Sequence, residues 1–235
     1  MITAIWMLLL GASIVAILMA RNLHQSEQYS FEREQIAHRY ALDSAVENVA
    51  ADLLFNGPRS TFAQLPNETG YSIGGVNVTV KVSSESGKID VNQADIALVE
   101  RALRGLAASA QSREVFLDQI KASRAADRPF QSALDIAAAL QQSGLCGGSI
   151  QEDLGQFFTA YSGLAQPQQG QIDPQLARAL GQPHVGSGGR TRPGTAIRVE
   201  ARSEQEQVQV AVLRVGGSLS QSHVLVDWFQ SGVCR

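Results

Sequence analysis

The side chains that most often bind metals or carry catalysis are few and scattered in this sequence of 235 residues. The four histidines, His24, His38, His184 and His223, do not follow the spacing of a metal site. The P-loop and the C-x-x-C pair are missing from the sequence. The one match to the nucleophile elbow G-x-S-x-G, Gly70–Gly74, precedes a predicted strand, whereas a nucleophile elbow leads into a helix. The stretch Gly186–Arg190 superficially resembles a phosphate cradle, but no Lys-Ser or Lys-Thr pair follows it, so we interpret it as a loop. We therefore expect a protein that is not an enzyme and binds no cofactor.

Two cysteines, Cys146 and Cys234, lie far apart in the sequence. In an oxidising compartment they are a candidate disulfide, provided that the fold brings their Cα atoms within bridging distance. The alternative is two unpaired thiols, one in a glycine-rich loop and one close to the C-terminus. The sequence leaves both alternatives open.

The charge of the chain argues against nucleic acid as a partner. The formal net charge is −3 and the isoelectric point is about 5.8, so no basic field surrounds the protein. Residues Lys88–Ala94 are similar to part of a helix-hairpin-helix DNA-binding module. Residues Gly105–Ala107, however, do not form the glycine hairpin through which such a module would bind phosphate. Nucleic acid is therefore not an expected partner.

The first 56 residues predict one long α-helix. Gly11 is the only glycine before Gly57, and Pro58 is the first proline of the chain. At ~1.5 Å rise per residue, about 55 helical residues would reach about 80 Å. A glycine followed by a proline then stops the helix. Such a helix is typical of a stalk that holds a soluble body at a distance or packs beside other helices.

The two parts of this helix differ in polarity. Ile2–Ala20 has no charged residue and nearly matches the ~30 Å hydrocarbon core of a bilayer, so residues 1–20 are expected to be a transmembrane part. The alternative is a cleaved signal peptide, with Leu18-Met19-Ala20 as its cleavage site. Residues 21–56 are expected to form an amphipathic helical stem, with His24 and His38 on its solvated side.

Apolar residues along the whole helix are predicted to serve stem packing and membrane contact. They are Ile5, Trp6, Leu8, Leu9, Ile14, Val15, Leu18, Leu42, Val46, Val49 and Leu53. The last four lie at i, i+4, i+7 and i+11, which places them on one face of the helix. Ile36 precedes them and is expected on a similar face.

Beyond the helix, the pattern of apolar residues predicts strands at both ends of the body. Val76, Val78, Val80 and Val82 alternate with polar residues, as in a strand with one buried face. The same character returns in three later segments, near residues 197–201, 208–212 and 223–229. We expect all of these strands to share one antiparallel sheet, because a lone hairpin is only marginally stable.

The region between the strands is rich in alanine, leucine and glutamine, and it predicts an all-α domain. Helices are expected near residues 94–107, 111–122, 131–142, 150–159 and 173–181. Asp90 or Asn92 is the expected N-cap of the first of them. The fold class is therefore α+β, with a long N-terminal helix packed on an antiparallel sheet and an all-α domain inserted between strands.

This fold class divides the body into four parts. Residues 57–90 are expected to form the first part of the sheet domain, and residues 91–181 the inserted helical domain. Residues 182–195 are the expected linker, and residues 196–235 the last strands of the sheet domain.

Several stretches, in the same order along the chain, resemble the minor pseudopilin K family of type II secretion, also called general secretion pathway protein K. The first is the apolar start Ile2–Leu9 with its tryptophan. The second, Glu85–Ala94, reads ESGKIDVNQA, and the third, Pro129–Asp135, reads PFQSALD. The last is Phe158–Gly163, which reads FTAYSG and is followed by IDP at Ile172–Pro174. Each motif is weak alone, and their shared order makes the resemblance specific.

The resemblance implies a pilin-like fold and a structural role. A family member would be a minor pseudopilin at the tip of the pseudopilus, where it initiates or caps assembly and helps to export folded proteins from the periplasm. Its partners would be other minor pseudopilins through the stem helices, the inner membrane, and secreted substrates or the outer-membrane channel. Its location would be the inner membrane, crossed once, with the body in the periplasm of a Gram-negative-type envelope. The alternative is a membrane-anchored periplasmic binding module that recruits a protein partner without filament assembly.

Three further features of the family are compared with this sequence. The family is made with a basic leader ending in glycine, and we expect such a leader to lie upstream of Met1. Thr3 stands where most pilin-like stems have a buried glutamate, which suits a subunit with no neighbour above it. The family often binds calcium in its helical insertion, but Lys121–Arg128 has one carboxylate, whereas calcium takes about six to eight oxygen ligands. The calcium site is therefore not carried over.

Overall fold

The structure is a computed structural model that describes residues 2–145, 156–183, 189–190, 194–218 and 221–230. Within this range it describes the side chains of all residues except 2–5, 7–18, 20–28, 30, 215–218, 221–224 and 230. Cys146 and Cys234, the candidate disulfide, lie outside the described residues.

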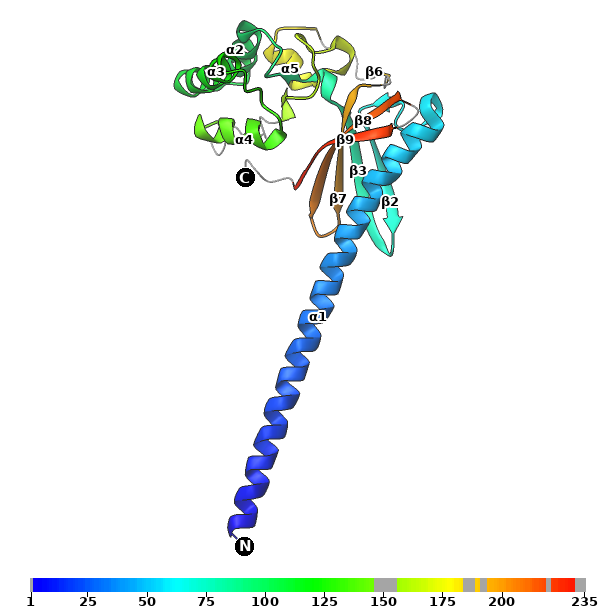
Figure 1. The fold of residues 1–235 in the computed structure, drawn as a ribbon, viewed down its shortest axis with the longest axis vertical. Helices are drawn as coiled ribbons and strands as arrows, with labels where there is room; N and C mark the ends of the chain where they lie inside the picture. Colours follow the sequence, from blue (N-terminus) through cyan, green and yellow to red (C-terminus); the bar gives the residue numbers. More distant parts are fainter. Residues whose placement is uncertain (1, 146–155, 184–188, 191–193, 219–220, 231–235) are drawn as a thin grey trace.

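A single helix, α1 (Ile2–Asn56), forms the stem that the sequence predicted. Figure 1 shows that its N-terminal part projects far from the body, while its C-terminal part lies on the sheet. The helix ends where Gly57 adopts a positive φ of 46° and begins the 3₁₀ turn η1 (Gly57–Arg59). Asp52 fixes this end, because its carboxylate accepts hydrogen bonds from the Ser60 hydroxyl and the Thr61 N–H.

Within the residues it describes, the structure has no helix that is both long enough and apolar enough to cross a membrane. The assignment of residues 1–20 as a transmembrane part stays a prediction.

One five-stranded antiparallel sheet forms the centre of the body, in the order β2-β3-β7-β8-β9. Its strands are β2 (Asn67–Ile73), β3 (Val76–Ser84), β7 (Ala196–Ser203), β8 (Val208–Ser218) and β9 (Gln221–Gln230). The central pairing joins β3 to β7, although about half of the chain separates them in sequence. A separate two-stranded pairing joins β1 (Gln64–Leu65) to β6 (Gly189–Arg190). Strand β6 lies within residues 182–195, which were expected to be a linker.

The stem covers one face of this sheet and closes the first hydrophobic core. Leu42, Val46, Val49 and Leu53 are all buried there, packed with the inward valines of β3 and with apolar residues of β7 and β8. The valines of β3 are buried, and the residues between them are exposed or half-buried, as the period of two in a strand requires. The predicted fold class, a helix packed on an antiparallel sheet, is confirmed.

The inserted domain has its own core. Its helices are α2 (Ile96–Gly105), α3 (Ala110–Ala125), α4 (Ala133–Gln142) and α5 (Pro174–Ala179), with the 3₁₀ turns η2 (Glu85–Gly87) before them and η4 (Gln169–Gln171) between α4 and α5. Phe116 of α3 meets Phe158 edge-on, with ring centroids 5.6 Å apart. Figure 1 shows this domain at the end of the molecule opposite to the N-terminus.

Three local predictions are wrong. Residues Phe158–Thr159, expected at the end of a helix near 150–159, form β5, which pairs in parallel with β4 (Ile89–Asp90). Residues 150–155 of that expected helix lie outside the described part of the chain. The N-cap of α2 is Asp95, not Asp90 or Asn92, because the Asp95 carboxylate accepts from the Ala97 N–H. His38 is buried rather than solvated, because it lies where the stem first meets the sheet.

Two neighbouring leucines of α1 test the stem–sheet packing. Leu53 is 6% exposed in the core, whereas Leu54 is 37% exposed on the outer side of the same helix. We expect Leu53→Ala to lower the free energy of unfolding by about 2–4 kcal/mol through lost burial and a cavity, and Leu54→Ala to lower it by under about 1 kcal/mol. Urea unfolding followed by the fluorescence of Trp228, which packs against this core, measures both. Equal losses in the two variants would contradict the packing.

Candidate functional site

The segment from Glu85 to Ala94 links the sheet to the inserted domain, and its polar residues hold the two together. We call the contacts of this segment with the sheet and the insertion the junction. The side chain of Ser84, at the end of β3, accepts a hydrogen bond from the Ser86 N–H at 3.1 Å, which turns the chain into η2. This turn directs Glu85 inward, and its side chain is completely buried.

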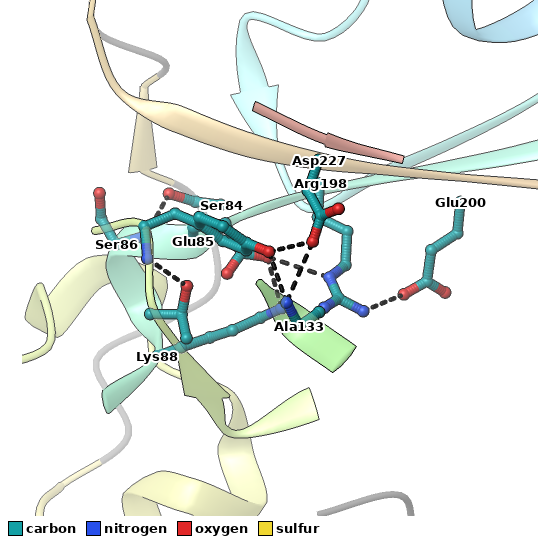
Figure 2. Close-up of polar contacts among 10 residues, drawn as sticks. Ser84, Glu85, Ser86, Lys88, Ala133, Arg198, Glu200 and Asp227 are labelled. Atoms are coloured by element: carbon teal, nitrogen blue, oxygen red, sulfur yellow. Dashed lines mark hydrogen bonds and ion pairs between the residues drawn. The ribbon is translucent and has the colours of Figure 1, made fainter. Parts of the chain in front are cut away.

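Glu85 lies between two cations. Its Oε1 accepts from Lys88 Nζ at 2.6 Å and from Arg198 Nε, on β7, at 3.0 Å. Figure 2 shows both cations converging on this one carboxylate. The guanidinium of Arg198 also lies 3.6 Å from Glu200 Oε1 and 5.4 Å from the centroid of the Phe229 ring.

The charges in this cluster set each other's pKa. Burial alone would raise the pKa of Glu85, but the positive charges of Lys88 and Arg198 outweigh burial and hold that pKa at about 2. Burial lowers the pKa of Lys88 to about 8, and the charge of Arg198 acts in the same direction, whereas Glu85 opposes both. Glu85 is therefore ionised at neutral pH and tied to both sides of the junction.

Gly87 brings the junction into backbone contact with the insertion. A Cβ atom built at Gly87 would lie 1.9 Å from the carbonyl oxygen of Gln171, so a larger residue cannot fit without moving η4. Next to this close contact, the Gln168 N–H donates a hydrogen bond to the Ser86 carbonyl at 2.8 Å. The glycine of the ESGK stretch is thus required by packing.

Asp90 and Asn92 bind two of the other stretches that carried the family resemblance. The Asp90 carboxylate accepts from the Ser162 hydroxyl at 3.1 Å and from the Gly163 N–H at 2.7 Å. The Asn92 amide exchanges two hydrogen bonds with the backbone of Phe130, both 2.9 Å long. Motifs that are far apart in the sequence therefore meet at the junction.

A second group of contacts ties the insertion to the last strand. The N–H of Ala133, at the start of α4, donates to the Tyr161 hydroxyl at 2.6 Å and to Asp227 Oδ2, on β9, at 3.0 Å. The Tyr161 hydroxyl itself donates to Asp227. Burial and the neighbouring Asp227 raise the pKa of Tyr161, so its hydroxyl keeps its proton. Arg214, on β8, donates to the Tyr161 carbonyl at 2.9 Å.

These contacts fix geometry and do not form a catalytic arrangement. Each charged group of the junction is held by an ion pair or by backbone groups, as buried charges require. Across the described residues, no three side chains of histidine, cysteine, aspartate or glutamate come together as a metal site. The junction therefore positions the inserted domain on the sheet.

The structure divides the stem residues predicted from the sequence into two groups. Leu42, Val46, Val49 and Leu53 contact their own sheet, so they are not available to a partner helix. Trp6 is 64% exposed on the projecting part of α1. The others lie on α1 at positions whose side chains the structure does not describe: Ile5, Leu8, Leu9, Ile14, Val15 and Leu18. Their packing stays a prediction.

Sequence reasoning missed an apolar surface on the outer side of the stem. Tyr29, Ile36 and Tyr40 are 69%, 55% and 69% exposed, and their spacings of seven and four residues place them on one helix face. We call these three residues the stem stripe. Tyr40 is nine residues before Val49, about two and a half turns, so Tyr40 points away from the sheet, whereas Ile36 also lines a groove with Leu42 and Val208.

The expectation that Ile36 shares the buried face is wrong for the same geometric reason. Ile36 is six residues before Leu42, which is about 240° beyond a full turn, so it lines the groove beside β8 but stays 55% exposed outside the core. This signal was present in the sequence. The partnership of Glu85 with Arg198 was not, because only the fold brings the two residues together.

Removing the charge of Glu85 should destabilise the junction in a pH-dependent way. At pH 7 we expect Glu85→Gln to lower the free energy of unfolding by about 3 kcal/mol, since Lys88 and Arg198 lose their shared carboxylate. An acid whose pKa is lowered by folding stabilises the folded protein at pH values above its ordinary pKa of 4.5. This stabilisation is lost as the pH falls to about 2. The difference between wild type and variant should therefore shrink across that window in urea unfolding. Glu68→Gln, on exposed β2, is the control, and a pH-independent difference would contradict the role of Glu85.

A pair of glycines tests the backbone contact. Gly87→Ala should cost about 1–3 kcal/mol of stability, because its methyl group would overlap the Gln171 carbonyl. Gly170→Ala, next to that carbonyl, meets nothing within 4 Å and should be neutral within about 1 kcal/mol. Thermal unfolding of both variants measures the difference. If both are equally stable, the close approach at Gly87 is not a constraint.

Comparison with known proteins finds a similar fold in a solved structure. No family model matches the chain, and no curated protein matches it in sequence. A chain from the crystal structure of the GspK-GspI-GspJ complex of the enterotoxigenic Escherichia coli type 2 secretion system is similar to it, with a TM-score of 0.52 and 10% sequence identity. The similarity covers 88% of this chain and 99% of the other. At this identity the comparison concerns the fold, and the chain has a pseudopilin-like fold.

Proposed function

We propose that this chain is a structural component of a type II secretion pseudopilus, a minor pseudopilin of the K type. In this role its stem packs beside the stems of other minor pseudopilins, and its body sits at the filament tip, where it initiates or caps assembly. The body lies in the periplasm of a Gram-negative-type envelope and helps to export folded proteins.

The observation that carries this proposal is the long part of α1 that projects from the body. Among the described side chains of the stem, those of Trp6, Met19, Tyr29 and residues 31–37 are exposed, and burial on the sheet begins only at His38. This projecting part of the helix gains little stability from its own chain, because most helical stability comes from tertiary packing. Packing against the helices of neighbouring subunits would supply that stability.

The stem stripe supports the same role. It presents two tyrosines and an isoleucine on one face, and aromatic residues are enriched where proteins bind each other. Exposed Glu32, Arg33 and Glu47 lie beside this face and can select a partner by charge.

The inserted domain is positioned to make contacts beyond the filament. It lies at the end of the molecule opposite to the N-terminus (Figure 1), and the junction holds it on the sheet through the buried Glu85 cluster and the Tyr161–Asp227 contact. A rigid domain at the tip would be the part that meets secreted substrates or the outer-membrane channel.

The proposal is tested by purifying the full chain together with the other minor pseudopilins of the same source. We expect a complex, and we expect the double variant Ile36→Asp/Tyr40→Asp to weaken it by at least about tenfold, because charge replaces the apolar face. Val115→Asp/Leu134→Asp is the matched control, since both residues are exposed on helices of the insertion at 39% and 46%.

The outcomes separate the alternatives. If no complex forms at high micromolar concentration, the proposed function is wrong. If a complex forms but the stripe variant binds as well as wild type, the stem stripe is not part of the interface. Cross-links from Leu9 to a pseudopilin stem would support filament assembly, whereas a binding module without a filament predicts none.

A further inference from the structure

A small cavity lies beside the junction, between the sheet domain and the insertion. Its volume is about 160 Å³. Apolar side chains from both sides form much of its wall, including Leu65, Phe157, Ile172 and Leu176. Lys88 and Arg198 also line it, whereas Glu85, which pairs with both, does not.

Lys88 has more donors than the described part of the chain accepts. Its side chain is only 10% exposed, and an ammonium group carries three N–H donors. Among the described residues its hydrogen-bond acceptor is Glu85 Oε1, at 2.6 Å. Donors that are removed from bulk water and left without an acceptor are costly, so the cavity favours a ligand that can accept hydrogen bonds.

Among the described residues, the two most buried charged side chains of the lining are both cations. Lys88 and Arg198 are each 10% exposed, and Glu85, whose carboxylate they share, does not line the cavity. Glu200 is 35% exposed and 3.6 Å from Arg198, so water screens it more strongly. The remaining charged groups of the lining, Lys81 and Asp173, are exposed. Burial lowers the pKa of Lys88, and the charge of Arg198 acts in the same direction.

We infer that this cavity binds a small carboxylate, with the anionic group on Lys88 and its hydrocarbon part against the apolar wall. A volume of about 160 Å³ is that of about five water molecules, which suits a ligand the size of propionate or one amino-acid residue. Inorganic phosphate lacks the hydrocarbon part and would leave the apolar wall unfilled. The carboxylate has two sources, a free small acid or the C-terminal residue of a polypeptide, and the experiment separates them.

The chain makes this measurement simple, because it has three lysines, Lys81, Lys88 and Lys121. Carbon-13 labelling of lysine in the full chain gives one Cε signal for each, and exposed Lys121 is an internal reference. Addition of sodium propionate at constant ionic strength should shift the Lys88 signal saturably and raise the Lys88 pKa by at least about one unit. N-acetylalanine carries the same carboxylate on an amino-acid residue, and N-acetylalaninamide lacks the charge and should not shift the signal.

A variant that fills the cavity without changing its charges completes the test. Ser83→Leu adds bulk at the lining and should abolish the saturable shift, whereas Thr79→Leu places the same new side chain on the same strand outside the cavity and should preserve it. Amide spectra of both variants check that the fold is retained.

Each result decides a point. A saturable shift with propionate supports the site, and binding of N-acetylalanine at about tenfold lower concentration assigns it to a polypeptide terminus. The inference is overturned if neither carboxylate shifts Lys88 at concentrations up to about 50 mM. It is also overturned if sodium chloride or phosphate gives the same shift, or if the folded Ser83→Leu variant responds like wild type.

Discussion

The pairing of β3 with β7 is the constraint on which the rest of the body depends. Ser84 and Ile197 face each other across this ladder, so the chain that leaves the sheet at Ser84 must return to the same place more than a hundred residues later. An insertion with both ends fixed at one point would pivot if nothing else held it. The residues that come next to this pairing, Glu85 and Arg198, form the buried ion pair of the junction. The strand register thus brings together the charges that fix the insertion.

A buried charge cluster is a costly way to join two domains. Removing charges from water is unfavourable, and apolar residues of similar volume often stabilise a protein as well or better. What the cluster provides is direction, because a carboxylate shared by Lys88 and Arg198 accepts only one arrangement of η2 against β7. The hydrogen bonds of Asp90, Asn92 and Asp227 act in the same way, each linking one element to one other. Together they give the insertion a defined position at the end of the molecule.

The stem shows one helix serving two environments. Toward its C-terminus, every third or fourth residue is buried on the sheet, and the opposite face is exposed. Before His38, the described side chains are exposed. The stem stripe lies across this boundary, with Tyr40 over the sheet-bound part and Tyr29 on the projecting part. A partner helix lying along it would therefore meet both the stem and the body of this chain.

The sequence by itself determined the elements, because their signals are local. The absence of glycine and proline defined α1, the alternating valines defined β3, and the spacing of Leu42, Val46, Val49 and Leu53 defined the face that meets the sheet. The tertiary structure alone decided what depends on distant partners. Phe158 and Thr159 became a strand because the backbone of Ile89 and Asp90 lies beside them, and Glu85 became the centre of the junction because the β3–β7 register delivers Arg198 to it. Periodicity reports which face of an element is buried, but only the assembled fold specifies what that face meets.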